Sequence, residues 1–482
     1  MDNDENLCSL VSSRGPSRLV HIVHRTPDGA RMSSSTLHHE ERPTHYRWVV
    51  LTVIFITYVI CMADRSNIGA VLPMIKGEFE ISNFASGAIS SFFFLGYAIS
   101  QIPAGLVMTK KGTRHIVSLA VLLFSIITFC MGFATTAVAL LVLRLLLGLM
   151  EGPTPVGMTS TVNAWFPPKE KGTATGVYIA STQFAPIIVP IIAVALANAQ
   201  GWRSVFHWFA VPGVVMAIVF FLVQRTHPGQ SRCVNAAELA RITSTDTGGT
   251  EKRVDFGDMG WIDRLIRLRD EKPLDTNGRI MRSWNIWGNT IAYFFMNNVL
   301  YGMLTWIPSY LVTARGYNFI KMGFVASAPS IGGLVGALVG GVVSDRVFRG
   351  RRKPTMLITA LMTAVMMVVV LVVPQNTVLV VGSLILTGFF LNIGWPMFTA
   401  YAMNLTTDGT YPFAISVINS GGNLGGFFAP IIVGALLDAF GGNYTVAFSY
   451  FVVVLLIGLV LILTLTEGRP APKVGAATAT RA

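Results

Sequence analysis

The amino-acid sequence predicts an all-α membrane protein in which twelve transmembrane helices form two six-helix bundles. Of the 482 residues, 52% are hydrophobic and only 12% are charged, whereas a soluble domain carries about 25% charged residues. Apolar blocks of about 20 residues, the length that crosses a bilayer, recur about twelve times. One long polar stretch divides these blocks into two sets of six. These three observations define the fold class.

The elements are predicted in the following order along the chain. Residues 1–46 lack the apolar region of a signal peptide and are predicted to form a disordered tail. The first bundle, 47–223, is predicted to cross the membrane near 47–72, 85–108, 115–135, 137–164, 173–196 and 203–223. A polar linker, 224–282, follows. The second bundle, 283–465, has predicted spans near 283–312, 321–344, 355–373, 377–402, 412–437 and 444–465. A polar tail, 466–482, ends the chain.

Basic residues gather in the short loops that lie on one side of this predicted topology. They follow spans two, four and eight, and they are Lys110, Lys111, Arg114, His115, Lys169, Lys171, Arg346, Arg349, Arg351, Arg352 and Lys353. Short cytoplasmic loops are enriched in Lys and Arg, so both termini and the linker are expected to be cytoplasmic. The same rule accounts for the net charge of +12, so this charge does not require a nucleic-acid partner.

A loop motif repeats at the same place in each half. Gly105 is followed four residues later by Thr109 and a basic turn, and Gly341 is followed by Asp345 and Arg346 with the same spacing. Each glycine is expected on a packing face between helices. Two six-span halves related by an axis along the membrane normal form a known transporter arrangement. Two ordinary basic loops would be the simpler alternative.

Over residues 46–466 the chain resembles the major facilitator superfamily. Its signature in this loop is Gly-x-x-x-Asp-Arg-x-Gly-Arg-Arg. The resemblance implies a gating role for Gly105, Gly341, Asp345 and Arg346, because in this family the acid locks the two halves together on the cytoplasmic side. Thr109 replaces the acid in the first copy. The lock is therefore expected to depend on Asp345.

Four ionisable residues lie deep in apolar runs: Asp64 and Arg65 in span one, and Arg144 and Glu151 in span four. A charge at the bilayer centre costs about 3 kcal/mol or more unless it faces a cavity or a partner. Seven residues are close to two helical turns, so Arg144 and Glu151 share one face, about 10 Å apart. Static ion pairs that fix helix packing are an alternative, but buried pairs add little net stability.

Two acids and two bases at this depth can couple an anion to a proton. Burial favours the protonated carboxyl group, whereas a neighbouring guanidinium favours the ionised one. An anionic substrate that binds the guanidinium frees the acid to take a proton, so the two ligands favour each other. The planar fork of arginine suits a carboxylate ligand. The predicted partners are therefore a small organic anion and protons.

Within the superfamily, the chain resembles the anion:cation symporter family. The resemblance rests on Asp64-Arg65, on Arg144-x6-Glu151-Gly-Pro, and on the motifs around Tyr97, Trp306 and Asn423. Members carry sugar acids such as galactonate, glucarate, hexuronates and tartrate, or aromatic acids such as phthalate, with protons. The resemblance implies that Asp64 and Glu151 are proton sites and that Arg65 binds the substrate carboxylate. It implies that Arg144 lies near the substrate and supports the conformational switch. It also implies a bacterial inner membrane location.

Polar side chains that could contact the substrate occur in several spans. The candidates are Tyr97, Gln183, Asn297, Tyr301, Asn392 and Asn423. Amides and phenols can bind sugar hydroxyl groups, although a hydrogen bond between packed helices would explain each residue taken alone. Spans seven and ten contain no deep acid. The first half is therefore expected to carry the coupling, and the second half to recognise hydroxyl groups.

Several other functions remain open at the level of sequence. They are uptake of an aromatic carboxylate, exchange of phosphate or phosphate esters, and a transporter-like receptor that signals through residues 224–282. A drug efflux antiporter fits poorly, because residues 182–190 of span five lack the Gly-Pro-rich motif of that group. No nucleophile–base set, metal-ligand spacing or nucleotide loop is present in the sequence. The chain is therefore predicted not to be an enzyme and to hold no cofactor and no metal. It is also predicted to be a monomer.

Overall fold

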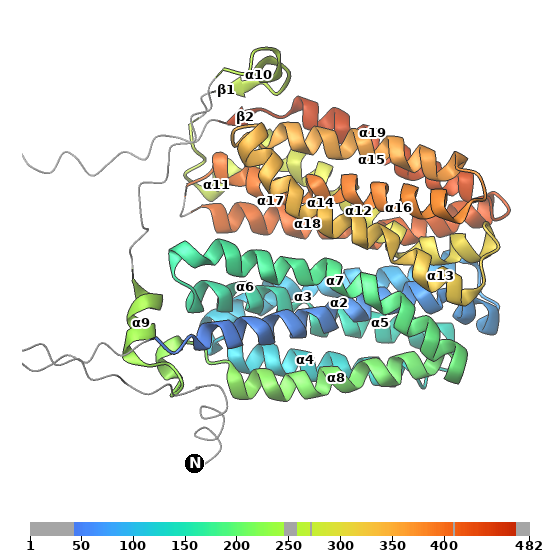
Figure 1. Ribbon diagram of the computed structural model, residues 1–482, viewed down its shortest axis with the longest axis horizontal. Helices are drawn as coiled ribbons and strands as arrows, with labels where there is room; N and C mark the ends of the chain where they lie inside the picture. The colour runs from blue at the N-terminus through green and yellow to red at the C-terminus, as the bar shows by residue number, and fades with distance from the viewer. Residues whose placement is uncertain (1–42, 245–257, 270–271, 408–409, 469–482) are drawn as a thin grey trace, which may run out of the picture.

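The computed structural model describes residues 43–244, 258–269, 272–407 and 410–468. Nearly all of the described chain is helical, and the helices lie roughly parallel in two groups (Figure 1). The all-helical fold class predicted from the sequence is confirmed. The predictions for residues 1–42 and 469–482 lie outside the described ranges.

The first group of helices, α2 to α8, is called the first bundle. Its members are α2 (Tyr46–Phe79), α3 (Asn83–Lys111), α4 (Thr113–Met131), α5 (Ala137–Glu151), α6 (Pro153–Trp165), α7 (Pro168–Gln200) and α8 (Trp202–Val223). Polar side chains fix several of the helix starts. The Ser82 hydroxyl accepts the Ala85 backbone N–H, and the Thr136 hydroxyl accepts that of Ala139. Such N-caps satisfy donors that a helix start leaves free.

The second group, α12 to α19, is called the second bundle. It contains α12 (Trp284–Thr313), α13 (Phe319–Ala326), α14 (Ala328–Val342), the π-helical turn η2 (Val343–Val347), α15 (Lys353–Val372), α16 (Thr377–Ile393), α17 (Trp395–Ala400), the 3₁₀ turn η3 (Tyr401–Asn404), α18 (Tyr411–Ala439) and α19 (Tyr444–Thr464). Its buried residues form one continuous apolar core with those of the first bundle.

Eleven segments of the described chain are long and apolar enough to cross a membrane. The sequence predicts twelve, and the difference is α12. This helix is 30 residues long, but it is not among the eleven. Its buried residues include Asn285, Asn289, Asn297 and Asn298, which make it less apolar than the other spans.

Three predicted spans are broken rather than continuous. The span at 137–164 divides into α5 and α6 at Gly152, that at 321–344 into α13 and α14 at Ser327, and that at 377–402 into α16 and α17 at Gly394. A proline begins each second piece or lies one residue inside it. Proline has no backbone N–H and clashes with the preceding turn, which favours a break or a kink; Pro186 and Pro308 lie inside helices that continue. Breaks therefore occur at corresponding places in the two halves, before α6 and before α17.

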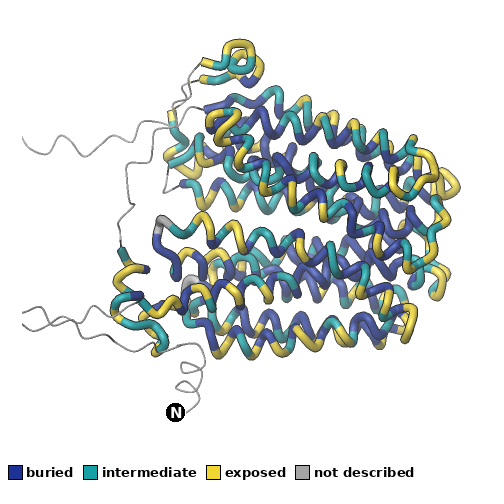
Figure 2. The backbone as a smooth tube through the Cα atoms, viewed as in Figure 1, coloured by how far each residue is buried: buried dark blue, intermediate teal, exposed yellow. Residues whose placement is uncertain are grey.

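The two bundles repeat the same packing scheme. In the first bundle α2 packs on α7, α3 on α5, and α4 on α8; in the second, α12 packs on α18, α14 on α16, and α15 on α19. Between the bundles, α3 packs on α18, α2 on α12, and α7 on α13 and α14. Residues that face these neighbours are buried, while exposed residues lie on the outer faces and at the ends (Figure 2).

The polar linker contains ordered pieces that the sequence does not predict. They are η1 (Pro228–Gln230), α9 (Ala236–Thr243), α10 (Trp261–Leu265), β1 (Leu268–Arg269) and α11 (Asn277–Arg282). Strand β1 pairs in parallel with β2 (Glu467–Gly468), which follows α19. The end of the bundles that carries these pieces is called the linker end, on the left in Figure 1. The other end is called the opposite end.

Two carboxylates hold these pieces to the bundles by capping helices from far along the chain. Glu238 of α9 is fully buried and accepts the backbone N–H groups of Tyr46 at 2.9 Å and Arg47 at 3.1 Å, at the start of α2. Glu467 accepts those of Arg352 at 3.1 Å and Lys353 at 2.8 Å, at the start of α15. Burial raises the pKa of the Glu467 carboxyl group, against the opposite effect of these donors.

Candidate functional site

A buried ion pair joins α2 to α5 in the middle of the first bundle. The Arg65 guanidinium lies 2.7 Å (Nε) and 2.6 Å (Nη2) from Glu151 Oε1. Arg65 is 3% exposed in its side chain and Glu151 is fully buried. Glu151 is the last residue of α5, directly before the helix break at Gly152. The structure thus brings together one expected proton site and the expected substrate-binding arginine.

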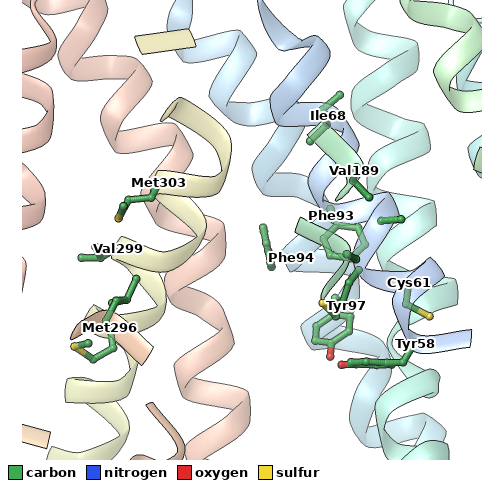
Figure 3. Close-up of a cluster of buried hydrophobic side chains, with 14 of the residues drawn as sticks. Tyr58, Cys61, Ile68, Phe93, Phe94, Tyr97, Val189, Met296, Val299 and Met303 are labelled. Atoms are coloured by element: carbon green, nitrogen blue, oxygen red, sulfur yellow. The ribbon is translucent and has the colours of Figure 1, made fainter. Parts of the chain in front are cut away.

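Aromatic side chains of α3 support the Arg65 guanidinium. Its Cζ atom lies 4.3 Å from the centre of the Tyr97 ring and 5.3 Å from that of Phe93. Figure 3 shows Phe93, Phe94 and Tyr97 on α3 beside α2, with Phe94 turned towards α12. A cation over an aromatic face is stabilised further when both are desolvated. Tyr97 therefore orients Arg65 in addition to any contact with a substrate.

Arg144 binds the backbone of Asp64 and not its carboxylate, unlike the expected carboxylate–guanidinium pair. Arg144 Nη1 donates to the backbone carbonyl of Asp64 at 2.9 Å, and Nη2 donates to Asn67 Oδ1 at 3.3 Å. The Asp64 carboxylate instead accepts hydrogen bonds from Thr128 Oγ1 at 3.0 Å and Asn67 Nδ2 at 3.3 Å. The expectation that each acid is paired with an arginine thus holds in this conformation for Glu151 and not for Asp64.

Two members of this cluster are not predicted from the sequence. Asn67 lies one helical turn after Asp64, and this spacing is a usable signal. Thr128 lies on α4 among apolar residues. A threonine in a span commonly bonds to its own helix backbone, so nothing in the sequence singles it out.

Several expected substrate contacts meet across the two bundles. Gln183 on α7 donates from Nε2 to Asn392 Oδ1 on α16 at 2.9 Å. Tyr301 on α12 lies against Phe94 with 4.3 Å between ring centres, and its hydroxyl group interacts with Arg65. The Tyr301 contact places α12 beside the ion pair, and the Gln183–Asn392 bond joins α7 to α16 across the two bundles.

Two further expected contacts belong to the second bundle alone. Asn297 Oδ1 accepts the indole N–H of Trp395 at 3.2 Å, and its buried Nδ2 atom has no hydrogen-bond partner among the described residues. Asn423 is half-buried on α18. A buried amide donor without a partner is costly. The Asn297 side chain also interacts with Tyr293, and its role as a substrate contact stays a prediction.

The loop-motif residues do not have their expected packing role in this conformation. A Cβ atom at Gly341 would meet nothing within 4 Å, and one at Gly105 would meet only Val156 at 3.9 Å. The close approach is made one residue earlier, by Gly340, whose Cβ position lies 1.8 Å from the Ile393 carbonyl oxygen. Neighbouring residues of an α-helix are rotated by about 100° around its axis, so Gly340 faces the end of α16 and Gly341 points elsewhere.

The acid of the loop motif is bound within its own bundle. Asp345 is exposed and pairs with Arg352 at 2.5 Å, and Arg346 is exposed to solvent. At the opposite end a different acid joins the bundles. Asp438 of α18 accepts the backbone N–H groups of Asn83 at 2.9 Å and Phe84 at 2.7 Å, at the start of α3. Among the described residues, no group of three or more His, Cys, Asp or Glu is arranged to hold a metal ion.

Two repeated helical bundles with buried opposite charges and interrupted helices are the arrangement of a membrane transporter. The profile of the Major Facilitator Superfamily matches residues 54–352 and 321–482. The chain belongs to this superfamily and is a multi-pass membrane protein, as the sequence motifs predict.

Curated relatives match most of the chain. The protein named "probable galactarate/D-glucarate transporter GudP" of Bacillus subtilis (strain 168) is 29% identical over 83% of this chain and 88% of its own. The D-galactonate transporter of Escherichia coli O6:H1 is 28% identical over 86% and 95%. The hexuronate transporter of Bacillus subtilis (strain 168) is 25% identical over 81% and 88%.

A solved structure shares the fold. The crystal structure of a bacterial homologue of the human lysosomal transporter Spinster, in an inward-facing and occupied conformation, superposes with a TM-score of 0.67 at 16% identity. The match covers 86% of this chain and 96% of that one. At this identity the likeness concerns the fold alone.

Proposed function

We propose that this protein is a proton-coupled symporter of organic anions, and that its substrate is a sugar acid with one carboxylate. The observation that carries the proposal is the buried pair between Arg65 and Glu151. The relatives named as D-galactonate and hexuronate transporters support a sugar acid with one carboxylate. The relative named for galactarate and D-glucarate, which carry two carboxylates, supports a sugar acid in general.

The coupling follows from competition for one guanidinium. Without substrate, Glu151 holds Arg65. A substrate carboxylate that binds Arg65 leaves Glu151 buried and without its partner, and an isolated buried carboxylate is neutralised by a proton. Anion and proton then bind together more tightly than either alone. Asp64, bonded to Thr128 and Asn67, is proposed as the second proton site, and Arg144 as the residue that holds its backbone during the change.

Recognition of the rest of the substrate is assigned to the neutral groups of the second bundle. Among the described residues of the second bundle, the buried charged side chains are Arg351 and Lys353, and both lie at the linker end. The groups assigned to recognition are the buried Asn297 and Asn392 and Tyr301, which interacts with Arg65, together with Gln183 from the first bundle and Asn423 on α18. Amides and phenols bind hydroxyl groups well and offer no counter-charge to a second carboxylate. This favours a hydroxylated monocarboxylate.

The topology completes the proposal. We infer that α12 is the twelfth span, because it is long enough and is packed between α18, α19 and α2. The linker end is assigned to the cytoplasm on the basis of its basic loops. Asp438 bonds the bundles at the opposite end while Asp345 stays within its own bundle. This combination suits a conformation that is closed to the outside.

The test is uptake into proteoliposomes under an imposed pH gradient. Labelled galactonate should accumulate when the outside is acidic and should equilibrate only slowly when both sides have the same pH. Equal uptake with and without the pH gradient would contradict the proposed coupling of substrate to protons. Inorganic phosphate and phthalate serve as competitors, because strong inhibition by either would favour phosphate exchange or aromatic acid uptake instead. Binding without flux would favour the receptor.

A further inference from the structure

One segment of the linker, residues 258–269, lies beside the second bundle and outside its outline. In Figure 1, α10 and β1 project beyond the end of α19 on the side that faces away from the first bundle. Figure 2 shows that much of this projection is exposed. The segment is therefore placed next to the bundle, where a bilayer surface would meet the linker end.

Hydrogen bonds attach the segment firmly to the linker end of the second bundle. Arg351, in the loop before α15, binds Asp263 through two hydrogen bonds of 2.6 and 2.9 Å. Lys353 donates to the carbonyl oxygen of Ile266 at 3.0 Å. Strand β1 pairs with β2 directly after α19 ends. These three contacts fix α10 at the level where α15 begins and α19 ends, which is the boundary of the membrane-spanning region.

The segment has one buried side and one exposed apolar side. Ile266 is fully buried beneath it. Trp261 is 71% exposed and Leu265 is 45% exposed. These two residues are four positions apart and therefore lie on the same side of the helical turn. Large apolar side chains held outwards at a membrane boundary are typical of groups that enter the headgroup region.

Positive charge surrounds this apolar side. Arg264, Arg267 and Arg269 are exposed on the same segment. Arg346 and Arg349 are exposed in the loop that holds Asp263 through Arg351. Of the two acids in 258–269, Asp263 is neutralised by Arg351 and Asp258 is exposed. Among the described residues of this segment, the exposed charges next to the tryptophan are therefore mainly positive.

We propose that Trp261, Arg264, Leu265 and Arg269 form a docking surface for anionic phospholipid in the leaflet at the linker end. Trp261 and Leu265 enter the interface between headgroups and acyl chains, and the arginines bind phosphate oxygens bidentately. Basic loops alone would satisfy the topology rule without exposed apolar residues or a buried anchor. The combination of Trp261 with the Asp263–Arg351 anchor is what points to a lipid.

The experiment follows thermal unfolding of the full-length protein in a neutral detergent. Dioctanoyl phosphatidylglycerol, dioctanoyl phosphatidylcholine and inorganic phosphate are each titrated separately. Phosphatidylglycerol should raise the unfolding midpoint in a saturable manner, and the other two should not. Arg264→Gln should increase the half-saturating concentration about fivefold, and the double variant with Arg269→Gln further, because each arginine near an anionic surface contributes about 1 kcal/mol.

The matched control is Arg232→Gln, an exposed arginine in the part of the linker that precedes α9. It changes the net charge equally and should leave the half-saturating concentration as in the wild type. The proposal would be overturned if Arg232→Gln increased the half-saturating concentration as much as Arg264→Gln does. It would also be overturned if phosphatidylcholine or phosphate raised the unfolding midpoint as much as phosphatidylglycerol.

A second measurement tests the placement of Trp261. In vesicles, lipids brominated near the headgroup should quench more of the tryptophan fluorescence in the wild type than in Trp261→Phe. Equal quenching of the two proteins by these lipids would contradict insertion.

Discussion

Asp438, at the end of α18, caps α3 of the other bundle by accepting the backbone N–H and the side-chain Nδ2 of Asn83, at 2.9 and 2.7 Å. A helix start has donors without partners and a partial positive charge, and both favour a carboxylate. This cap exists only while the two bundles are together at the opposite end. In the proposed transport cycle, this contact must therefore break when the opposite end opens.

Replacing Asp438 by alanine should shift the protein towards opening at the opposite end. A helix cap contributes about 1 kcal/mol, which corresponds to about a fivefold change in the ratio of open to closed molecules. Spin labels on exposed positions Gly77 and Phe440 would report this as a larger long-distance population. Asp438→Asn keeps one acceptor oxygen, so its long-distance population should lie between those of the wild type and the alanine variant. Identical distance distributions in all three proteins would show that the cap does not govern closure.

Arg65→Lys should weaken substrate binding although the charge is kept. Lysine cannot form the planar contact with Tyr97 together with a bidentate carboxylate bond, so the apparent affinity should fall at least about tenfold. The control is Arg114→Lys, because Arg114 stacks on Phe221 at 4.1 Å away from the site. Uptake of galactonate at several concentrations measures both variants. An unchanged apparent affinity in Arg65→Lys would show that the Arg65 guanidinium is not needed for substrate recognition.

Glu151→Gln should bind substrate but lose its response to pH. Glutamine mimics the protonated acid and cannot release a proton, so the ratio of uptake with and without the gradient should fall to about one. Exchange of labelled for unlabelled substrate should continue, because it needs no net proton movement. Uptake that still follows the gradient would assign coupling elsewhere, with Asp64 as the next residue to replace by asparagine.

Galactonate should compete for uptake more strongly than galactarate. The second carboxylate of galactarate would face the neutral groups around Asn297 and Asn392. A buried charge without a partner is costly, so at least about a tenfold difference in inhibition constant is expected. Stronger inhibition by galactarate would indicate a cation that reaches the site in another conformation.

Glu238→Ala should destabilise the first bundle by about 2–4 kcal/mol, because it removes a helix cap and one partner of the buried Arg47. Arg47 Nη1 lies 3.0 Å from Glu238 Oε1, and its Nε remains bonded to Glu170. Thermal unfolding in detergent measures the loss. Asp275→Ala, which removes an exposed acid from the same linker, should leave the midpoint unchanged. Equal midpoints for both variants would mean that α9 is not structurally required.

The sequence identifies much of the site because charges stand out in apolar runs. Asp64, Arg65, Arg144 and Glu151 are visible for this reason, and the structure brings them together. Which arginine meets which acid is not visible, since it depends on how α2 and α5 are rotated against each other. Spacing within α5 cannot determine a contact with α2.

Other features could not be predicted because their signals are common or distant. Thr128 is one of several hydroxyl groups in apolar spans. Glu238 and Glu467 lie in polar stretches, where an acid is unremarkable until its partner in the fold is known. Proline alone does not locate the helix breaks, because Pro103, Pro186 and Pro308 also lie within predicted spans and yet inside continuous helices.

The cap that Glu238 provides to α2 has a consequence for biosynthesis. The backbone N–H of Tyr46 is satisfied by a side chain that lies 192 residues later in the chain. The first helix to enter the membrane therefore keeps an incomplete first turn until all the other helices of its bundle have been synthesised. A chain that ends at residue 224 would contain every helix of that bundle and still lack this cap. The part that matures independently extends through Thr243, where α9 ends.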